Sequence, residues 1–365
     1  MRIAYYAPVD VSIESGVTKK ILSQVTAWLA HQVEVKVFAY STSWKIWKGF
    51  PASLIEVVAR GNALNRLHRV NRLVRSILDW KPDLVYMRVG FYYPPLEYLM
   101  RRIPTVLEIN TNDLAEARLY LSPAKYLYYR VTRKRLLRCA AGLICMTEEL
   151  ARLFGSFGLP TAVIPNGINL EDYVQLPPSE NPFPTLLFMG HAWEKVKSPL
   201  RSASYRYHGI EKMLQIARAF PEWNLIIIGF DQIDPALPNM LVYGHLSRTN
   251  YEALVRDADV AIGPLGLHVK SMQEACPLKV REYLAYGLPV IIGYRDSDFP
   301  SGASFLLQLP NTHDNVEKNL DQIREFICRW KGRRVPRSEI AHLDVAYKET
   351  QRLNFMRNVL AGCAK

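Results

Sequence analysis

Short apolar runs alternate with amphipathic segments along the first half of the chain. The runs have the length of strands buried in a parallel sheet, and the apolar positions between them recur with helical spacing. Strands are predicted at residues 3–7, 33–39, 54–58, 84–88, 105–109, 142–146 and 162–164. Helices are predicted at residues 17–31, 63–80, 94–102, 123–140 and 148–157.

The second half repeats this alternation. Strands are predicted at residues 185–189, 225–228, 240–242, 259–262, 290–292 and 305–309. Helices are predicted at residues 210–220, 250–256, 277–286 and 315–330. Alternation of this kind favours an α/β fold with a doubly wound parallel sheet in each half, and ligands bind such sheets at the carboxyl ends of the strands.

A polar segment rich in proline, QLPPSENPFP, separates the two halves and is typical of an interdomain linker. We predict a first domain at residues 1–173, a linker at 174–184, a second domain at 185–344 and a final helix at 345–365. A chain of 365 residues with 49% hydrophobic and 22% charged residues is long enough for two globular domains of ordinary size.

The stretch QEACPLKVREYLAYGLPVIIGY, residues 273–294, carries the clearest functional pattern. Pro277 suits the first turn of a helix, and Gly287 ends that helix before a buried strand. Glu274 and Glu282 flank the helix start, which offers free N–H groups to a phosphate, and Lys279 adds a charge in the first turn. A ligand lying along this element meets a carboxylate, an anion site and a second carboxylate. Nucleotide diphosphate sugars have hydroxyls, diphosphate and ribose hydroxyls in that order.

This stretch resembles the Glu-x7-Glu signature of the retaining glycosyltransferases of family 4 (glycosyl transferases group 1). The match is to the variant whose helix runs Pro-Leu-Lys-x-x-Glu-Tyr-Leu-Ala-x-Gly-x-Pro-Val. The resemblance implies the GT-B fold, in which two Rossmann-like domains face each other across a cleft and a C-terminal helix crosses back to the first domain. It also implies transfer of a sugar from a nucleotide diphosphate sugar to an acceptor hydroxyl with retention of configuration, in the synthesis of cell-surface polysaccharide or glycolipid.

The resemblance implies a role for each matching residue of the helix region. Glu274 is the catalytic carboxylate that holds the sugar hydroxyls, and Glu282 holds the ribose. Pro277, Leu278 and Lys279 belong to the donor site. No cofactor or metal is expected, because the nucleotide sugar is a co-substrate and relatives handle the leaving diphosphate with amides and cations. Two Asp-x-Asp patterns, at Asp257 to Asp259 and Asp296 to Asp298, are therefore interpreted as structural.

Further segments match the family at successive points. Ser15 and Gly16 lie in a loop that resembles the family's glycine-containing loop at the cleft, although a lone glycine before a helix is also an ordinary turn. VIPNGINLEDY resembles the segment that ends the first domain. Tyr243 and Gly244, in VYGHL, resemble the segment whose backbone contacts the nucleotide base.

The sequence departs from the family at two cationic positions of the donor site. After Gly190 the family has arginine and this chain has His191, and before the next helix His208 stands where a lysine is common. Neutral histidine is a weaker phosphate partner than either cation. Two alternatives remain: Lys279 carries more of the charge, or the diphosphate is held from the preceding loop by one of Lys195, Lys197, Arg201 and Arg206.

Glu108 lies near the carboxyl end of a predicted strand, in the region where the relatives implied by the resemblance often place a histidine near the reacting carbon. A carboxylate there either orients the acceptor and takes up its proton, or caps a helix or pairs with Arg88. Both alternatives stay open at this point.

The net charge of +12 is concentrated in the first half, which has 23 Lys and Arg against 14 Asp and Glu up to Gln175. An anionic partner is expected for this half. Residues 118–138 contain seven basic residues, no acidic one and several tyrosines, so they either rest on an anionic membrane surface, which suits a lipid-linked acceptor, or form a solvated helix face.

Five cysteines without a Cys-x-x-Cys pair, and no apolar run long enough to span a membrane, suggest a cytoplasmic protein, either free or peripheral on the inner face of the membrane. Two rival classes remain. One is a GT-B relative with other chemistry, such as a nucleotide-sugar epimerase or a catalytically silent subunit. The other is a basic nucleic-acid-binding protein, against which the lack of a recognition motif counts.

Overall fold

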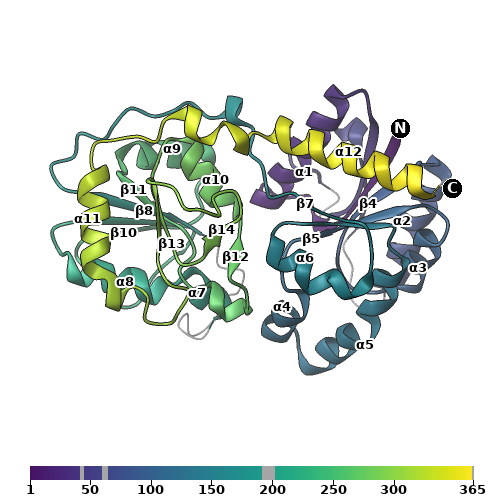
Figure 1. Cartoon of the computed structure of the whole chain (residues 1–365), viewed down its shortest axis with the longest axis horizontal. Helices are drawn as coiled ribbons and strands as arrows, with labels where there is room; N and C mark the ends of the chain where they lie inside the picture. The colour runs from purple at the N-terminus through teal and green to yellow at the C-terminus, as the bar shows by residue number, and fades with distance from the viewer. Residues whose placement is uncertain (42–44, 60–64, 191–201, 364–365) are drawn as a thin grey trace. The chain divides into compact units, whose positions relative to one another are not determined.

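A computed structural model describes residues 1–41, 45–59, 65–190 and 202–363. The chain divides into two compact units (Figure 1). One consists of Met1–Gly167 together with Val345–Lys365, and the other of Ile168–Asp344.

The first unit is built on a parallel sheet whose seven strands have the order β3-β2-β1-β4-β5-β6-β7. Its strands are β1 (Arg2–Asp10), β2 (Glu34–Ser41), β3 (Ile55–Ala59), β4 (Leu84–Arg88), β5 (Thr105–Ile109), β6 (Gly142–Cys145) and β7 (Thr161–Val163). The order reverses between β1 and β4, because the chain first builds outward from β1 to β3 and then returns to the other side of β1. The carboxyl ends of β1 and β4 therefore meet at the switch point, where sheets of this type bind ligands.

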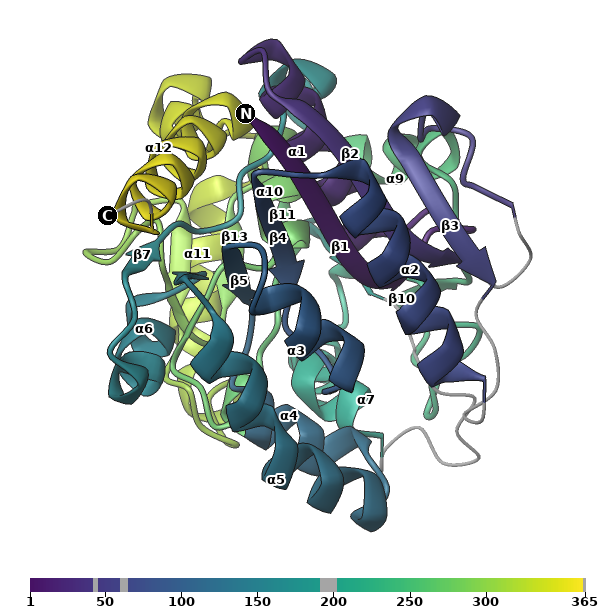
Figure 2. The same cartoon turned by 90° about the vertical axis from the view of Figure 1, so that its right-hand side faces the viewer.

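Seven helices accompany this sheet in the described residues. They are α1 (Gly16–Ala30), α2 (Arg66–Trp80), α3 (Pro94–Met100), α4 (Asp113–Tyr120), α5 (Pro123–Cys139), α6 (Glu148–Phe154) and α12 (Val345–Cys363). The last helix lies beside α1 (Figures 1 and 2), and Glu349 accepts a hydrogen bond of 2.8 Å from the indole of Trp28. Because both side chains are buried, the C-terminal helix is part of the core of the first unit.

The second unit has a six-stranded parallel sheet of order β10-β9-β8-β11-β13-β15. Its strands are β8 (Thr185–Met189), β9 (Asn224–Ile228), β10 (Met240–Tyr243), β11 (Val260–Ile262), β13 (Val290–Ile292) and β15 (Leu306–Gln308). Its helices are α7 (Ala203–His208), α8 (Ile210–Ala219), α9 (Arg248–Asp257), α10 (Leu278–Ala285) and α11 (Leu320–Trp330). Here the order reverses between β8 and β11, so this unit has a switch point of its own.

A second, two-stranded sheet pairs β12 (Glu274–Ala275) with β14 (Arg295–Asp296) in parallel. Short 3-10 turns complete the described chain at Ala52–Leu54, Gly155–Phe157, Leu170–Asp172, Leu267–Lys270, Glu317–Asn319 and Arg337–Leu343.

The predicted fold of two doubly wound domains and a C-terminal helix that returns to the first is confirmed. Every predicted strand is present, and Leu84–Arg88 and Thr185–Met189 have the predicted bounds. The division between the units lies at Gly167 and Ile168, a few residues before the predicted boundary at residue 173.

The segment predicted as a linker forms hydrogen bonds with the second unit. The Leu176 amide donates to the Tyr286 carbonyl at 3.1 Å, and the Gln175 side chain donates to the Val335 carbonyl at 2.8 Å. Proline prevents this segment from joining a helix or sheet, but it still packs as part of a folded unit.

Candidate active site

The donor-side residues gather around the start of α10, which follows β11 and so begins at the carboxyl edge of the second sheet. Pro277 has extended backbone angles (φ −64°, ψ 137°) and caps the helix, one position earlier than a first-turn proline. Val280, Tyr283 and Leu284 are fully buried and fix the helix against the sheet. This packing positions the residues at the helix start, among them the half-buried Pro277 and Leu278.

Glu274 lies on β12, directly opposite Arg295 on β14. Its carboxylate is almost fully buried and forms an ion pair with the Arg295 guanidinium, which is about half exposed. Sequence analysis did not identify Arg295. The pair holds the Glu274 carboxylate in one orientation before any ligand arrives.

Glu282 lies inside α10, one turn after Lys279, and accepts a hydrogen bond of 2.5 Å from the Tyr251 hydroxyl on α9. Burial and the neighbouring Glu282 carboxylate raise the pKa of Tyr251 well above its ordinary value, so the tyrosine stays protonated as a donor. The Glu282 carboxylate is half-buried and held in one orientation.

Lys279 and His208, two predicted donor residues distant in sequence, lie side by side. The Lys279 ammonium is 3.4 Å from His208 Nδ1 and 4.4 Å from the centre of the Phe188 ring. Burial lowers the pKa of Lys279 to about 7, although Glu282 works in the opposite direction. The pair offers one ammonium group and one ring nitrogen to a phosphate.

Gly190 follows β8 at the switch point of the second sheet. A Cβ atom on it would lie 2.5 Å from the Phe188 ring and 2.6 Å from the Phe230 ring, so the position requires glycine. Tyr243 is the last residue of β10, the edge strand of this sheet, and Gly244 follows it. The Gly229 amide donates to the carbonyls of both residues, at 2.8 and 3.1 Å. His191, Lys195, Lys197 and Arg201 lie outside the described residues.

Arg281 is a buried residue of the site that sequence analysis missed. It donates to Asp296 and Asp298, the pair examined as an Asp-x-Asp pattern, with distances of 2.6 to 2.8 Å. The other pattern is also structural, because the buried Asp259 accepts from the amides of Thr185 and Gly332. Across the described ranges, no three His, Cys, Asp or Glu side chains are grouped to hold a metal ion.

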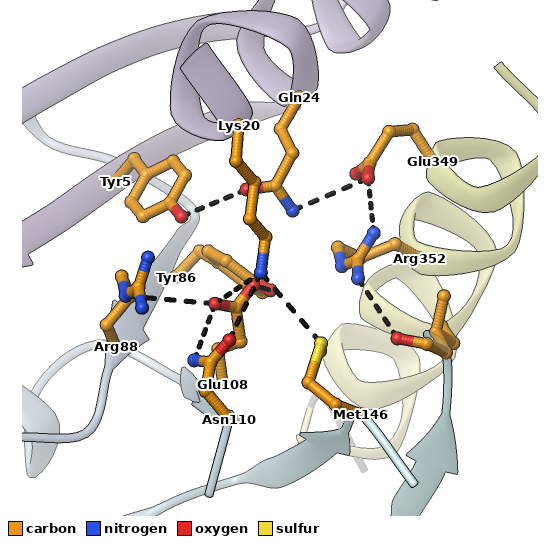
Figure 3. Close-up of polar contacts among 11 residues, drawn as sticks. Tyr5, Lys20, Gln24, Tyr86, Arg88, Glu108, Asn110, Met146, Glu349 and Arg352 are labelled. Atoms are coloured by element: carbon orange, nitrogen blue, oxygen red, sulfur yellow. Dashed lines mark hydrogen bonds and ion pairs between the residues drawn. The ribbon is translucent and has the colours of Figure 1, made fainter. Parts of the chain in front are cut away.

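In the first unit, Glu108 is fully buried in a network of polar side chains (Figure 3). Its carboxylate accepts hydrogen bonds from Lys20 at 2.9 Å, Asn110 at 2.8 Å and Tyr86 at 2.5 Å, and lies 3.9 Å from the Arg88 guanidinium. Burial alone would raise the pKa of Glu108, but the surrounding cations hold it well below its ordinary value.

These contacts correct the proposed catalytic role of Glu108. A carboxylate with a strongly lowered pKa and no exposed surface cannot take up an acceptor proton, so the ion-pairing alternative is favoured. Its main partner is Lys20 on α1, which sequence analysis did not name. The pKa of Lys20 is lowered to about 8, chiefly by burial.

The predicted cleft loop begins α1 at the switch point of the first sheet. Ser15 is the N-cap: its hydroxyl accepts from the Thr18 amide at 3.1 Å, and the Thr18 hydroxyl accepts from the Ser15 amide at 2.8 Å. Gly16 is the first residue of the helix. The Ser15 side chain is therefore engaged in a capping box.

The basic segment 118–138 spans the end of α4 and most of α5. Tyr129 points inward and donates to Asp113 at 2.8 Å, whereas Leu127 and Val131 are 60% and 68% exposed. None of the described helices is both long and apolar enough to cross a membrane.

One family model matches part of the chain. Residues 15–167 match the family described as Glycosyl transferase 4-like domain. A search of curated protein sequences found no match.

Several solved structures resemble the chain over its length. Sucrose-phosphate synthase from Thermosynechococcus elongatus superposes with a TM-score of 0.61 at 14% identity, covering 100% of this chain and 97% of that one. A lipopolysaccharide outer core galactosyltransferase gives 0.66 at 11% identity, with 98% and 99% covered. A protein from Anabaena in complex with UDP and glucose gives 0.58 at 13% identity, with 97% and 99% covered. The chain therefore has the two-domain GT-B fold of these structures, and its residues 15–167 match the glycosyl transferase 4-like domain.

Proposed function

We propose that the protein transfers a hexose from a nucleotide diphosphate sugar to an acceptor hydroxyl with retention of anomeric configuration. One observation carries this proposal: Glu274, the Lys279–His208 pair and Glu282 follow one another around the start of α10, at the carboxyl edge of the second sheet. This arrangement supplies acceptors for sugar hydroxyls, then a cation, then an acceptor for ribose hydroxyls. The solved complex of the Anabaena protein with UDP and glucose supports the same class of donor.

The cation of this site can stabilise a diphosphate as it leaves the donor sugar. Negative charge builds on the leaving diphosphate as the bond to the anomeric carbon breaks, so a cation beside it stabilises the transition state more than the ground state. Lys279 supplies that cation. Glu274 and Glu282 fix the donor by its hydroxyls, which orients the anomeric carbon. Retention rests on the resemblance to the family and is tested by the anomeric configuration of the product.

The acceptor side suits a glycan or lipid-linked acceptor of cell-surface polysaccharide or glycolipid synthesis. The exposed Leu127 and Val131 lie among the exposed cations Lys125, Arg130 and Lys134 of α5. Apolar side chains surrounded by cations are typical of helices that rest on anionic bilayers. The proposal therefore includes a peripheral position on the cytoplasmic face of a membrane.

Thermal unfolding with UDP-, GDP- and ADP-sugars tests the donor class, because a ligand that binds only the folded state raises the melting temperature. We expect one nucleotide class to raise it, and Glu282→Ala to abolish most of the shift. Asp257→Asn, a carboxylate change at the exposed end of α9, is the matched control and should keep the full shift. A wild-type protein that responds to no nucleotide sugar would refute the proposal.

Product analysis separates the transferase from its rivals. Slow hydrolysis of the donor to free sugar and nucleoside diphosphate supports glycosyl transfer, whereas conversion of the donor into its epimer supports an epimerase. Binding without turnover supports a silent subunit. Tight duplex binding that weakens steeply with salt would support a nucleic-acid-binding protein.

A further inference from the structure

Arg88 is the last residue of β4 and lies at the switch point of the first sheet. Tyr6 of β1 pairs with Met87, so Arg88 is the next position toward the carboxyl edge. The following loop lies close to β1, since a Cβ atom on Gly90 would be in van der Waals contact with the Pro8 ring, at 3.6 Å. The side chain of Arg88 is 17% exposed, so it can be reached from outside.

The network behind Arg88 has one positive charge in excess. Lys20, Arg88 and Arg352 are balanced by two carboxylates, of which Glu349 is paired with Arg352 and Glu108 is shared by Lys20 and Arg88 (Figure 3). Within the described part of the chain, Glu108 is the one carboxylate within 4 Å of the Arg88 guanidinium. An uncompensated charge this close to a core is unfavourable unless a counter-ion accompanies it.

The guanidinium of Arg88 also has an unsatisfied donor. Its Nη1 atom is buried and has no hydrogen-bond partner among the described residues. The oxygens of Glu108 are occupied by Lys20, Asn110 and Tyr86, and the Arg88 Nε atom remains 3.9 Å away. A buried N–H without a partner costs stability, so its presence at a switch point indicates a function.

We propose that Arg88 binds an oxyanion carried by the acceptor, so that the acceptor is an anionic sugar or an anionic sugar lipid. This inference rests on the proposed function and names the substrate class of its acceptor side. The planar fork of arginine matches the paired oxygens of a phosphate or a carboxylate. Such a group at the exposed edge of the guanidinium neutralises the excess charge. The basic surplus of the first half attracts the same class of ligand.

Isothermal titration of the full chain tests this inference with glucose 6-phosphate, glucuronate and glucose as probes. We expect at least one of the two anionic sugars to bind about tenfold to a hundredfold more tightly than glucose, the range given by a hydrogen bond to a charged group. Preference for glucose 6-phosphate indicates a phosphate, and preference for glucuronate a carboxylate. Arg88→Gln should remove the preference and Arg88→Lys should keep part of it. Arg72→Gln, an exposed change on α2, should keep all of it.

Stability and donor binding distinguish this role from a structural one. Because Arg88 adds excess charge and an unsatisfied donor, Arg88→Gln should leave the melting temperature of the ligand-free protein unchanged or raise it. The nucleotide sugar should also still raise the melting temperature of Arg88→Gln as much as that of the wild type. Equal binding of charged and neutral sugars by the wild type, or an unchanged preference in Arg88→Gln, would overturn the inference. If nucleotide sugars did not raise the melting temperature of the wild-type protein, the proposed function would be overturned instead.

Discussion

Arg281 donates two parallel hydrogen bonds to Asp296, of 2.8 and 2.7 Å, and both side chains are almost completely buried. Arg281 precedes Glu282 on α10, and Asp296 is part of β14, which pairs with the strand that carries Glu274. The ion pair therefore joins the two elements that hold the two carboxylates of the donor site. Its strength should determine how well the spacing of those carboxylates is kept.

Replacing Arg281 with methionine should lower the free energy of unfolding of the second unit by about 3 to 5 kcal/mol. The change leaves the carboxylates of Asp296 and Asp298 buried without a cation. Urea denaturation of the full chain measures the loss. Lys318→Ala, which removes an exposed ion pair with Asp314, should cost less than about 1 kcal/mol. Equal losses in the two variants would show that the buried pair does not stabilise the unit.

Replacing Tyr251 with phenylalanine should weaken binding of the nucleotide sugar by about tenfold. The hydroxyl donates to Glu282 and holds the carboxylate in the orientation that the ribose requires, and the ring itself stays in place. Titration calorimetry with the active nucleotide sugar measures the change. Tyr98→Phe, an exposed position on α3, is the matched control. An unchanged affinity in Tyr251→Phe would mean that Glu282 does not contact the ligand.

The elements of the fold could be predicted because their signals are local. Apolar runs such as Leu84–Arg88 and Thr105–Ile109 indicate strands from five consecutive residues. Pro277 and Gly287 likewise mark the start and the end of α10. The helix α4 was missed, although Asn112 caps it and Asp113 and Glu116 stand in its first turn. That combination of an N-cap with early acidic residues is a start signal that the sequence does contain.

The buried polar contacts that join residues far apart in sequence could not be predicted. Lys20 and Glu108 are 88 positions apart. Which cation contacts which carboxylate depends on how α1 packs against β5. The strands β12 and β14 have two residues each, too few for any periodic pattern. The role of Glu108 stayed open in the sequence for this reason: its place near the end of a strand was visible, but its burial among cations was not.

Binding of the nucleotide sugar should weaken as the pH rises above 7, because of Lys279. Burial lowers the pKa of this lysine to about 7, so the free protein loses the charge above that pH, whereas the bound diphosphate favours the ammonium. Binding at higher pH must therefore take up a proton, and affinity should fall by up to about tenfold per unit between pH 7 and 9. Calorimetric titrations across this range measure the slope.

Lys279→Arg provides the control for that pH dependence. Arginine keeps its charge throughout the range, so the slope should disappear even if the affinity at pH 7 changes. A slope that persists in Lys279→Arg would assign the titration to another group, of which the neighbouring His208 is the first to examine.

Replacing Glu108 with glutamine should destabilise the first unit by about 3 to 5 kcal/mol, because it leaves the Lys20 ammonium buried without its counter-ion. Lys20→Met combined with Glu108→Gln should recover part of this loss, since the uncompensated charge is then gone. Urea denaturation of the single and double variants measures the coupling. If Glu108 were the catalytic base, the single variant would instead lose turnover while keeping its stability.

Replacing both Leu127 and Val131 with serine should reduce co-sedimentation with phosphatidylserine-rich vesicles. The two exposed side chains supply the apolar part of the proposed contact, and the surrounding cations supply about 1 kcal/mol each near an anionic surface. Leu67→Ser is the matched control, because Leu67 is 49% exposed on the arginine-rich helix α2. Neutral phosphatidylcholine vesicles should bind neither the wild type nor the variants strongly. Equal loss in the control and the double variant would indicate a general effect of surface hydrophobicity, and no loss in either would remove α5 as the membrane contact.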